Sequence, residues 1–218
     1  SSFLVTAKLA GIAYILAVVL GVVVGVVAAV NHGKWVDSAL MTISVFGISA
    51  PAFWIAIILQ IVICLKFNLL PLSGIDSFKS FILPGIALGT RYAASIARIT
   101  RTSMLDVLSQ DYIRTAEAKG LKGWVVTIKH ALRNALIPII TIAGSDLGNI
   151  LTGSVLVESV FSIPGIGKML VDSINTRDLP IVQGGVMYIA VICVIMYLVV
   201  DLLYTVVDPR IRLGKESS

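Results

Sequence analysis

Four charged side chains interrupt the long apolar runs of this sequence: Arg91, Asp146, Glu158 and Asp201. An arginine at the centre of a membrane span costs about 2.5–3.5 kcal/mol on insertion scales, so such residues face protein or water and often mark ion or substrate pathways. Arg91 and Asp146 lie deepest in their runs, which makes them candidate residues of a substrate pathway. Structural pairing or snorkelling is the alternative. Glu158 and Asp201 lie near opposite ends of their runs, and both are expected to reach water.

A second group of charges gathers in one polar segment between two apolar runs. Seven of the 17 Lys and Arg residues lie between Arg98 and Arg133. Apolar residues recur there at three- and four-residue spacing, which predicts one helix over 104–119. These residues are Leu105, Leu108, Tyr112 and Ala116. Gly120 is expected to end that helix, and a second helix is expected to begin near Gly123.

A helix–glycine–helix element of this kind is suited to docking. Small residues precede the hinge (Thr115, Ala116, Ala118), so the turn could enter a partner's groove closely. An amphipathic pair lying on lipid headgroups fits the basic residues and Trp124 equally well. The residues alone do not distinguish docking to a protein partner from binding to the lipid surface.

No catalytic or metal-binding motif accompanies these charges. The sequence contains neither H-E-x-x-H nor G-x-S-x-G, and its two histidines, His32 and His130, fall in predicted loops. The run GIGKML (165–170) lacks the spacing of a phosphate-binding loop. Cys64 and Cys193 lie inside apolar runs without metal-ligand spacing. We therefore expect no catalytic residue and no metal site.

The composition determines which elements must carry these groups. The chain is 57% hydrophobic and 13% charged, whereas a soluble domain carries about 25% charged residues. A bilayer core needs about 20 helical residues. We therefore predict an all-α polytopic membrane protein, with 1–218 forming one transmembrane domain. The five expected spans cover about 9–30, 38–65, 81–100, 136–160 and 181–207, with a polar loop at about 103–135 and a kink near Ala50, before Pro51.

Basic residues predict the orientation of these spans. Placing the 103–135 loop and the C-terminal tail in the cytoplasm puts eleven Lys and Arg residues inside and five outside, with Arg91 in the membrane. Residue 1 is then outside and residue 218 inside. This distribution explains the net charge of +5 without a nucleic-acid partner.

Several motifs, occurring in order, resemble the permease subunits of binding-protein-dependent ABC importers, and within them the B-type subunit of the dipeptide/oligopeptide/nickel group. The matching stretches are DYIRTAEAKGL (111–121), HALRNALIP (130–138), VESVFSIPGIGKMLVDSI (157–174), RDLPIVQGG (177–185) and VDLLYTVVDPRIR (200–212). The resemblance covers essentially the whole chain. It implies the MetI-like permease fold, a further N-terminal span in other family members, and the plasma membrane of a bacterium or archaeon.

The family signature, Glu-Ala-Ala-x-x-x-Gly followed by Ile-x-Leu-Pro, is only partly present. Counting from Gly120, its glutamate falls on Arg114 and its proline on Arg133, so either Arg114 or Glu117 could make the polar contact with an ATPase. The resemblance implies that 111–121 couples to that ATPase. The implied coupling residues are Asp111, Tyr112, Arg114, Thr115, Ala116, Glu117, Ala118, Lys119, Gly120 and Leu121.

The resemblance also implies the partners. These are a second homologous permease, two ATPases at the cytoplasmic face, an extracytoplasmic solute-binding protein and membrane lipid. It implies no cofactor on this chain, with ATP and Mg on the ATPases, and import of di- or oligopeptides by alternating access. A proton-coupled secondary carrier is the alternative, motivated by the charges at membrane depth. An intramembrane enzyme is a third hypothesis, without a supporting motif.

Overall fold

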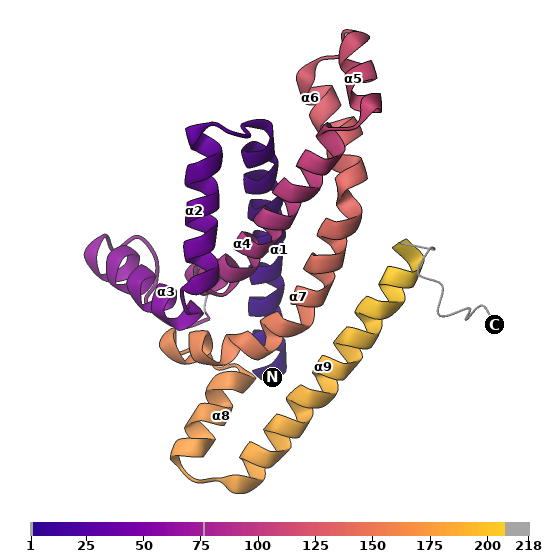
Figure 1. Cartoon of the computed structure of the whole chain (residues 1–218). Helices are drawn as coiled ribbons and strands as arrows, with labels where there is room; N and C mark the ends of the chain where they lie inside the picture. Colours follow the sequence, from indigo (N-terminus) through magenta and orange to yellow (C-terminus); the bar gives the residue numbers. More distant parts are fainter. Residues whose placement is uncertain (1, 76, 208–218) are drawn as a thin grey trace, which may run out of the picture.

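The computed structural model describes residues 2–75 and 77–207, except the side chains of 201 and 203–207, and every regular element in it is helical. Long helices run roughly side by side, and the short helices lie toward the two ends of the molecule (Figure 1). The elements are α1 (Ser2–Val30), α2 (Trp35–Ser49), α3 (Ala52–Leu59), the π-helix η1 (Gln60–Lys66), the 3-10 helix η2 (Phe78–Phe81), α4 (Ile82–Leu108), α5 (Asp111–Ala118), α6 (Gly123–Val125), the π-helix η3 (Val126–Leu132), α7 (Arg133–Val160), α8 (Ile166–Asn175) and α9 (Leu179–Val207).

Close approach of α1 to α4 forms the centre of the fold. A Cβ added at Gly21 would meet Ile96 Cβ at 2.7 Å, and one added at Gly25 would meet Thr100 Cβ at 2.5 Å. Small residues let helix backbones approach closely, which matters in lipid because no hydrophobic force drives one helix onto another. Gly21 and Gly25 therefore belong to the face of α1 that packs against α4.

The predicted spans correspond to helices of the structure. Within the described residues, three helices are long and apolar enough to cross a membrane: Ser2–Val30, Gly123–Val160 and Leu179–Val200. The bent pair Trp35–Ser49 and Ala52–Lys66 could form a fourth. Helix α4 is 27 residues long but carries Arg91, Arg98 and Arg101, and it is not among the candidates. The count of five stays a prediction.

The second predicted span is broken rather than kinked. Its two halves are bent by 107° at the break, a far larger angle than a proline kink near Ala50 implies. Ala50 and Pro51 both have extended backbone, and Pro51 precedes the first residue of α3. Proline lacks the donor needed to continue α2, and it disfavours helical backbone in the residue before it. These two effects separate the halves completely.

The expected helix over 104–119 is two helices. Helix α4 ends at Leu108 and α5 begins at Asp111, so the single-helix prediction is wrong. Ser109 Oγ and Gln110 Nε2 both donate to the backbone carbonyl of Asp106, at 2.8 and 3.2 Å. Polar side chains at this point satisfy a terminal carbonyl and allow the chain to turn.

The second helix of the polar loop begins at Gly123, as predicted, and continues directly into the fourth span. Gly123–Val160 forms one 38-residue candidate span that includes α6, η3 and α7. At about 1.5 Å per residue it extends about 57 Å. After α7 the chain turns and forms the short helix α8.

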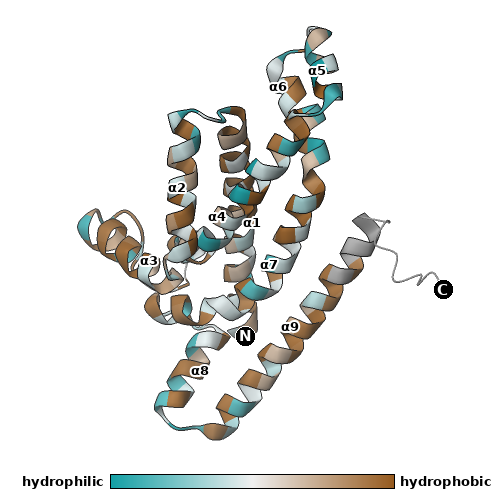
Figure 2. Cartoon of the chain, in the orientation of Figure 1, coloured by the Kyte–Doolittle hydropathy of each residue, from teal (hydrophilic) through white to brown (hydrophobic). Residues whose placement is uncertain are grey.

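The chain segments divide between two ends of the molecule. The α1–α2 turn and the α5–α6 segment lie at one end, and the N-terminus, α3 and α8 lie toward the other (Figure 1). Hydrophilic residues are conspicuous at the α5–α6 end, whereas much of α9 is hydrophobic (Figure 2). The basic C-terminal tail and the side chain of Asp201, which is expected from the sequence to reach water, lie outside the described residues.

Candidate functional site

The α5–α6 segment, which we call the docking segment (residues 111–125), projects beyond the helices that carry it (Figure 1). Two residues of α5, Ile113 and Ala116, are buried in a cluster with Val126 and Ala131 of η3. Tyr112 is anchored on its phenol oxygen by the side chain of Asn134, 3.1 Å away. The segment is therefore held to the long helix behind it.

The turn between α5 and α6 depends on Gly120. This residue has φ +76°, and its N–H donates to the carbonyl of Glu117 at 2.8 Å, while the N–H of Leu121 reaches the carbonyl of Ala116 at 3.4 Å. These are the two bonds of a Schellman motif, in which glycine adopts the left-handed conformation without a steric cost. The predicted end of the helix at Gly120 is confirmed.

The docking segment brings the predicted coupling residues together at the tip. Ala116 is buried and packs inward, and the other predicted coupling residues are exposed. The exposed residues are Asp111, Tyr112, Arg114, Thr115, Glu117, Ala118, Lys119, Gly120 and Leu121. Leu121 is 41% exposed and Trp124 is 68% exposed. Apolar and charged side chains thus share one free surface. Sequence reasoning did not single out Ile113, although its three-residue spacing to Ala116 was visible.

The two deep charges, Arg91 of α4 and Asp146 of α7, line one polar cavity of about 460 Å³. Its other lining residues are Ile48, Tyr92, Ser95, Asn149, Thr152 and Gly153. An adjoining cavity of about 370 Å³ shares Ile48, Arg91, Tyr92 and Gly153 and extends to the α2–α3 break. The structure therefore brings together the two residues proposed from sequence as a pathway.

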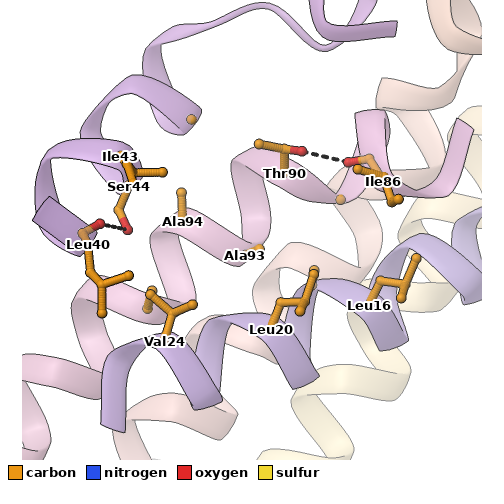
Figure 3. A pocket seen from close by; sticks show the side chains of 14 residues that line it. Leu16, Leu20, Val24, Leu40, Ile43, Ser44, Ile86, Thr90, Ala93 and Ala94 are labelled. Atoms are coloured by element: carbon orange, nitrogen blue, oxygen red, sulfur yellow. Dashed lines mark hydrogen bonds between the residues drawn. The ribbon is translucent and has the colours of Figure 1, made fainter. Parts of the chain in front are cut away.

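A smaller cavity between α1, α2 and α4 has a different character. It holds about 180 Å³ and is lined almost entirely by apolar side chains, including Leu16, Leu20 and Ile43 (Figure 3). Its two hydroxyls, on Ser44 and Thr90, donate to the carbonyls of Leu40 and Ile86 at 2.8 and 2.6 Å. Both hydroxyl protons are used within their own helices, and the cavity offers a ligand mainly apolar surface.

Glu158 does not reach water, contrary to the sequence-based expectation. Its side chain is fully buried, and Oε2 accepts hydrogen bonds from the backbone N–H groups of Gly167 at 2.8 Å and Lys168 at 3.2 Å. Thr6 Oγ1 accepts from the N–H of Ile166 at 2.9 Å. Helix α8 is thus capped by residues from α7 and α1, because its first N–H groups have no partner within the helix.

An ion pair joins the first turn of α2 to α4. Arg101 donates from Nε to Asp37 Oδ1 at 2.6 Å and from Nη2 to Asp37 Oδ2 at 2.7 Å. His32 Nδ1 lies 3.1 Å from the same Oδ2, and the N–H of Gly33 donates to it at 3.2 Å. His32 lies in a turn, as predicted, and its side chain contacts this ion pair. Asp37 and Arg101 are 64 positions apart, so sequence spacing could not indicate the pair.

We predict that Asp37→Ala destabilises the folded chain by about 3 kcal/mol, because removing one partner leaves the other charge uncompensated. Equilibrium unfolding in detergent micelles would measure it. The matched control is Asp172→Ala, which breaks the exposed Lys168–Asp172 pair at 2.9 Å and should cost at most about 0.5 kcal/mol. Equal effects of the two substitutions would contradict the prediction.

Among the described residues, no three His, Cys, Asp or Glu side chains are grouped so that they could hold a metal ion.

The sequence is similar to those of known membrane transport proteins. Residues 21–213 match the family described as "Binding-protein-dependent transport system inner membrane component". The chain is 44% identical over 212 residues to the glutathione transport system permease protein GsiC of Escherichia coli K12, covering 97% of this chain and 69% of that protein. GsiC of Salmonella typhi gives the same values.

Two solved structures share the fold. The inward-facing MetNI methionine ABC transporter aligns with a TM-score of 0.76 at 16% identity, covering 95% of this chain and 94% of that one. An amino acid ABC transporter with histidines aligns with a TM-score of 0.67 at 18% identity, covering 97% and 92%. The expected MetI-like fold is confirmed. The chain therefore belongs to the binding-protein-dependent ABC importer permeases of the peptide/nickel group, membrane transport subunits whose ATPase activity lies on partner subunits.

Proposed function

We propose that this chain forms half of the pore of an ATP-driven importer of di- or oligopeptides. The docking segment is the observation that supports this most directly. It presents an exposed tip around Gly120, its base is buried against η3, and it continues without a break into α7. An element lying loosely on lipid headgroups would not need a Schellman turn or a continuous helical connection to a membrane span.

In this proposal the docking segment sits in a groove of an ATPase subunit. The complete assembly contains this chain, a second homologous permease, two ATPases and an extracytoplasmic solute-binding protein, within membrane lipid. ATP and Mg bind the ATPases. Nucleotide binding favours one of two arrangements of rigid helices, and the pore opens alternately to either side. Arg114 and Glu117 are both exposed and both available for the polar contact.

Two observations support a peptide as the substrate. The 44% identical relative is named as a glutathione transport permease, and glutathione is a small peptide-type molecule. The polar cavity of this chain offers charges of both signs, as a peptide's termini require. The proposed orientation places residue 1 outside and the C-terminus in the cytoplasm. Membership of the family speaks against the proton-coupled carrier considered from sequence.

The test is transport by the complete complex in proteoliposomes. We expect uptake of trialanine or glutathione to require ATP and the binding protein, and to continue when an ionophore removes the proton gradient. A membrane-impermeant amine reagent applied to whole cells should leave Lys122 and Lys129 unlabelled. Uptake that follows the proton gradient and ignores ATP depletion, or labelling of either lysine from outside, would refute the proposal.

A further inference from the structure

We propose that the polar cavity between α4 and α7 binds the backbone of a short zwitterionic peptide, with Asp146 receiving its ammonium group and Arg91 its carboxylate. This inference rests on the proposed function, since it assumes that the cargo is a peptide. It adds which residues recognise the cargo and which end of the peptide each one holds.

The first support is the unsatisfied state of Asp146. Its side chain is only 9% exposed, and its Oδ2 is buried with no hydrogen-bond partner in the part of the chain that the structure describes. A buried charge without a partner is costly, and in a membrane protein it usually serves a pathway. A cationic ligand group would supply the missing partner.

The second support is that Arg91 and Asp146 share the cavity without pairing. Among the described residues Arg91 forms no ion pair within 4 Å, whereas Asp37 and Arg101 form a close bidentate one. Charge pairs with a purely structural role lie in direct contact, as Asp37 and Arg101 do. Two opposite charges held apart in one cavity leave room for a molecule with a charge at each end.

The third support is the remaining lining of the cavity. Ser95, Asn149 and Thr152 offer hydroxyl and amide groups to a peptide backbone, and Tyr197 of α9 holds Asn149 through a 2.8 Å hydrogen bond to Oδ1. The adjoining cavity adds Phe53 and Leu156, which suit apolar side chains. Volumes of about 460 and 370 Å³ lie within the range of small-molecule sites.

The α2–α3 break borders the same place. Ser49, Ala50 and Pro51 line the adjoining cavity. Irregular backbone at membrane depth is tolerated where it lines a protein cavity.

The placement of the two charges also connects binding to ATP. Arg91 lies on α4, which leads into α5, and Asp146 lies on α7, which continues from α6 and η3. The two helices that line the cavity are therefore the two that hold the docking segment. Movement of that segment would change the distance between Arg91 and Asp146 and so release the peptide.

The first experiment measures trialanine uptake by the complete transporter in proteoliposomes. We expect Asp146→Asn and Arg91→Gln each to reduce uptake by about ten-fold or more, the loss of one charge-assisted contact, while ATP hydrolysis is retained. The controls are Arg98→Gln, on the same helix but outside the cavity, and Asp106→Asn, an exposed acid. Uptake by both cavity variants at the control level would overturn the inference.

The second experiment reports binding without relying on uptake or on a charge substitution. In the Ser95→Cys variant of the full complex, trialanine should slow alkylation of the introduced thiol by N-ethylmaleimide. N-acetyl-trialanine, which lacks the ammonium group, and trialanine amide, which lacks the carboxylate, should protect much less. Equal protection by all three, or by none, would refute the recognition of both termini.

The two experiments separate this inference from the proposed function. ATP-driven trialanine uptake without any protection of the thiol would leave the importer in place and reject the cavity as its peptide site. Protection by trialanine without ATP-driven uptake would support the cavity and reject the coupling mechanism.

Discussion

Gly120→Trp is expected to abolish ATP-driven uptake while the permease still inserts and folds. The added side chain meets no atom within 4 Å of its Cβ position inside this chain, so folding should be preserved. The left-handed backbone at φ +76° costs a non-glycine residue about 1–2 kcal/mol, and the indole occupies the proposed contact surface of the ATPase. Uptake and ATP hydrolysis, measured together in proteoliposomes, should become uncoupled.

A substitution series separates the strain of the turn from the size of the side chain. Gly120→Asn should retain most uptake because asparagine tolerates the left-handed conformation, and Gly120→Ala should lose part of it. Gly123→Ala is the matched control, since Gly123 also has open space at Cβ but begins α6 without a positive φ. Uptake by Gly120→Trp at the parental rate would contradict the role of this turn.

Glu158→Ala is expected to destabilise the packing of α8 against α7. It leaves the N–H groups of Gly167 and Lys168 without their acceptor in a buried setting, which should destabilise the chain by about 2–4 kcal/mol. Glu158→Gln keeps one acceptor oxygen and should cost less. Unfolding in detergent, with limited proteolysis around α8, would measure both.

Asp178→Ala is the appropriate control for that experiment. Asp178 Oδ1 accepts from the N–H of Ile181 at 3.3 Å at the start of α9, in the same region but more exposed. Loss of such a cap costs about 1 kcal/mol. If Glu158→Ala were no more damaging than Asp178→Ala, α8 would not depend on the buried carboxylate.

The immediate surroundings of Glu158 explain why glycines stand there. A Cβ at Gly165 would collide with the Glu158 carboxylate, and one at Gly167 would collide with the backbone of Val155. The start of α8 can therefore approach α7 closely only with glycine at these two positions. The same argument gives the motif around 157–167 a physical meaning beyond family resemblance.

One helix connects the regions on which these predictions depend. The Gly123–Val160 helix begins at the docking segment, passes Asp146 in the polar cavity and ends beside the cap of α8. Because the helix is continuous through η3 and Pro138, movement at the tip can be passed along it to the cavity. This continuity is the structural basis for coupling in the proposed mechanism.

Local rules in the sequence were sufficient for the class of the protein and for the docking turn. Apolar runs long enough to span a bilayer, separated by basic segments, identify a helical membrane protein. Gly120 ends α5 as predicted, since only the left-handed conformation that glycine favours completes the turn. Both conclusions depend on neighbouring residues alone.

The tertiary structure decided what the charged residues do. Asp37 pairs with Arg101, and Glu158 caps α8. Asp146, whose buried Oδ2 has no hydrogen-bond partner among the described residues, shares a cavity with Arg91. It also decided that Pro51 separates two helices by 107° instead of bending one. The role of a buried charge depends on which groups lie within a few ångströms of it, and helices distant in sequence supply those groups.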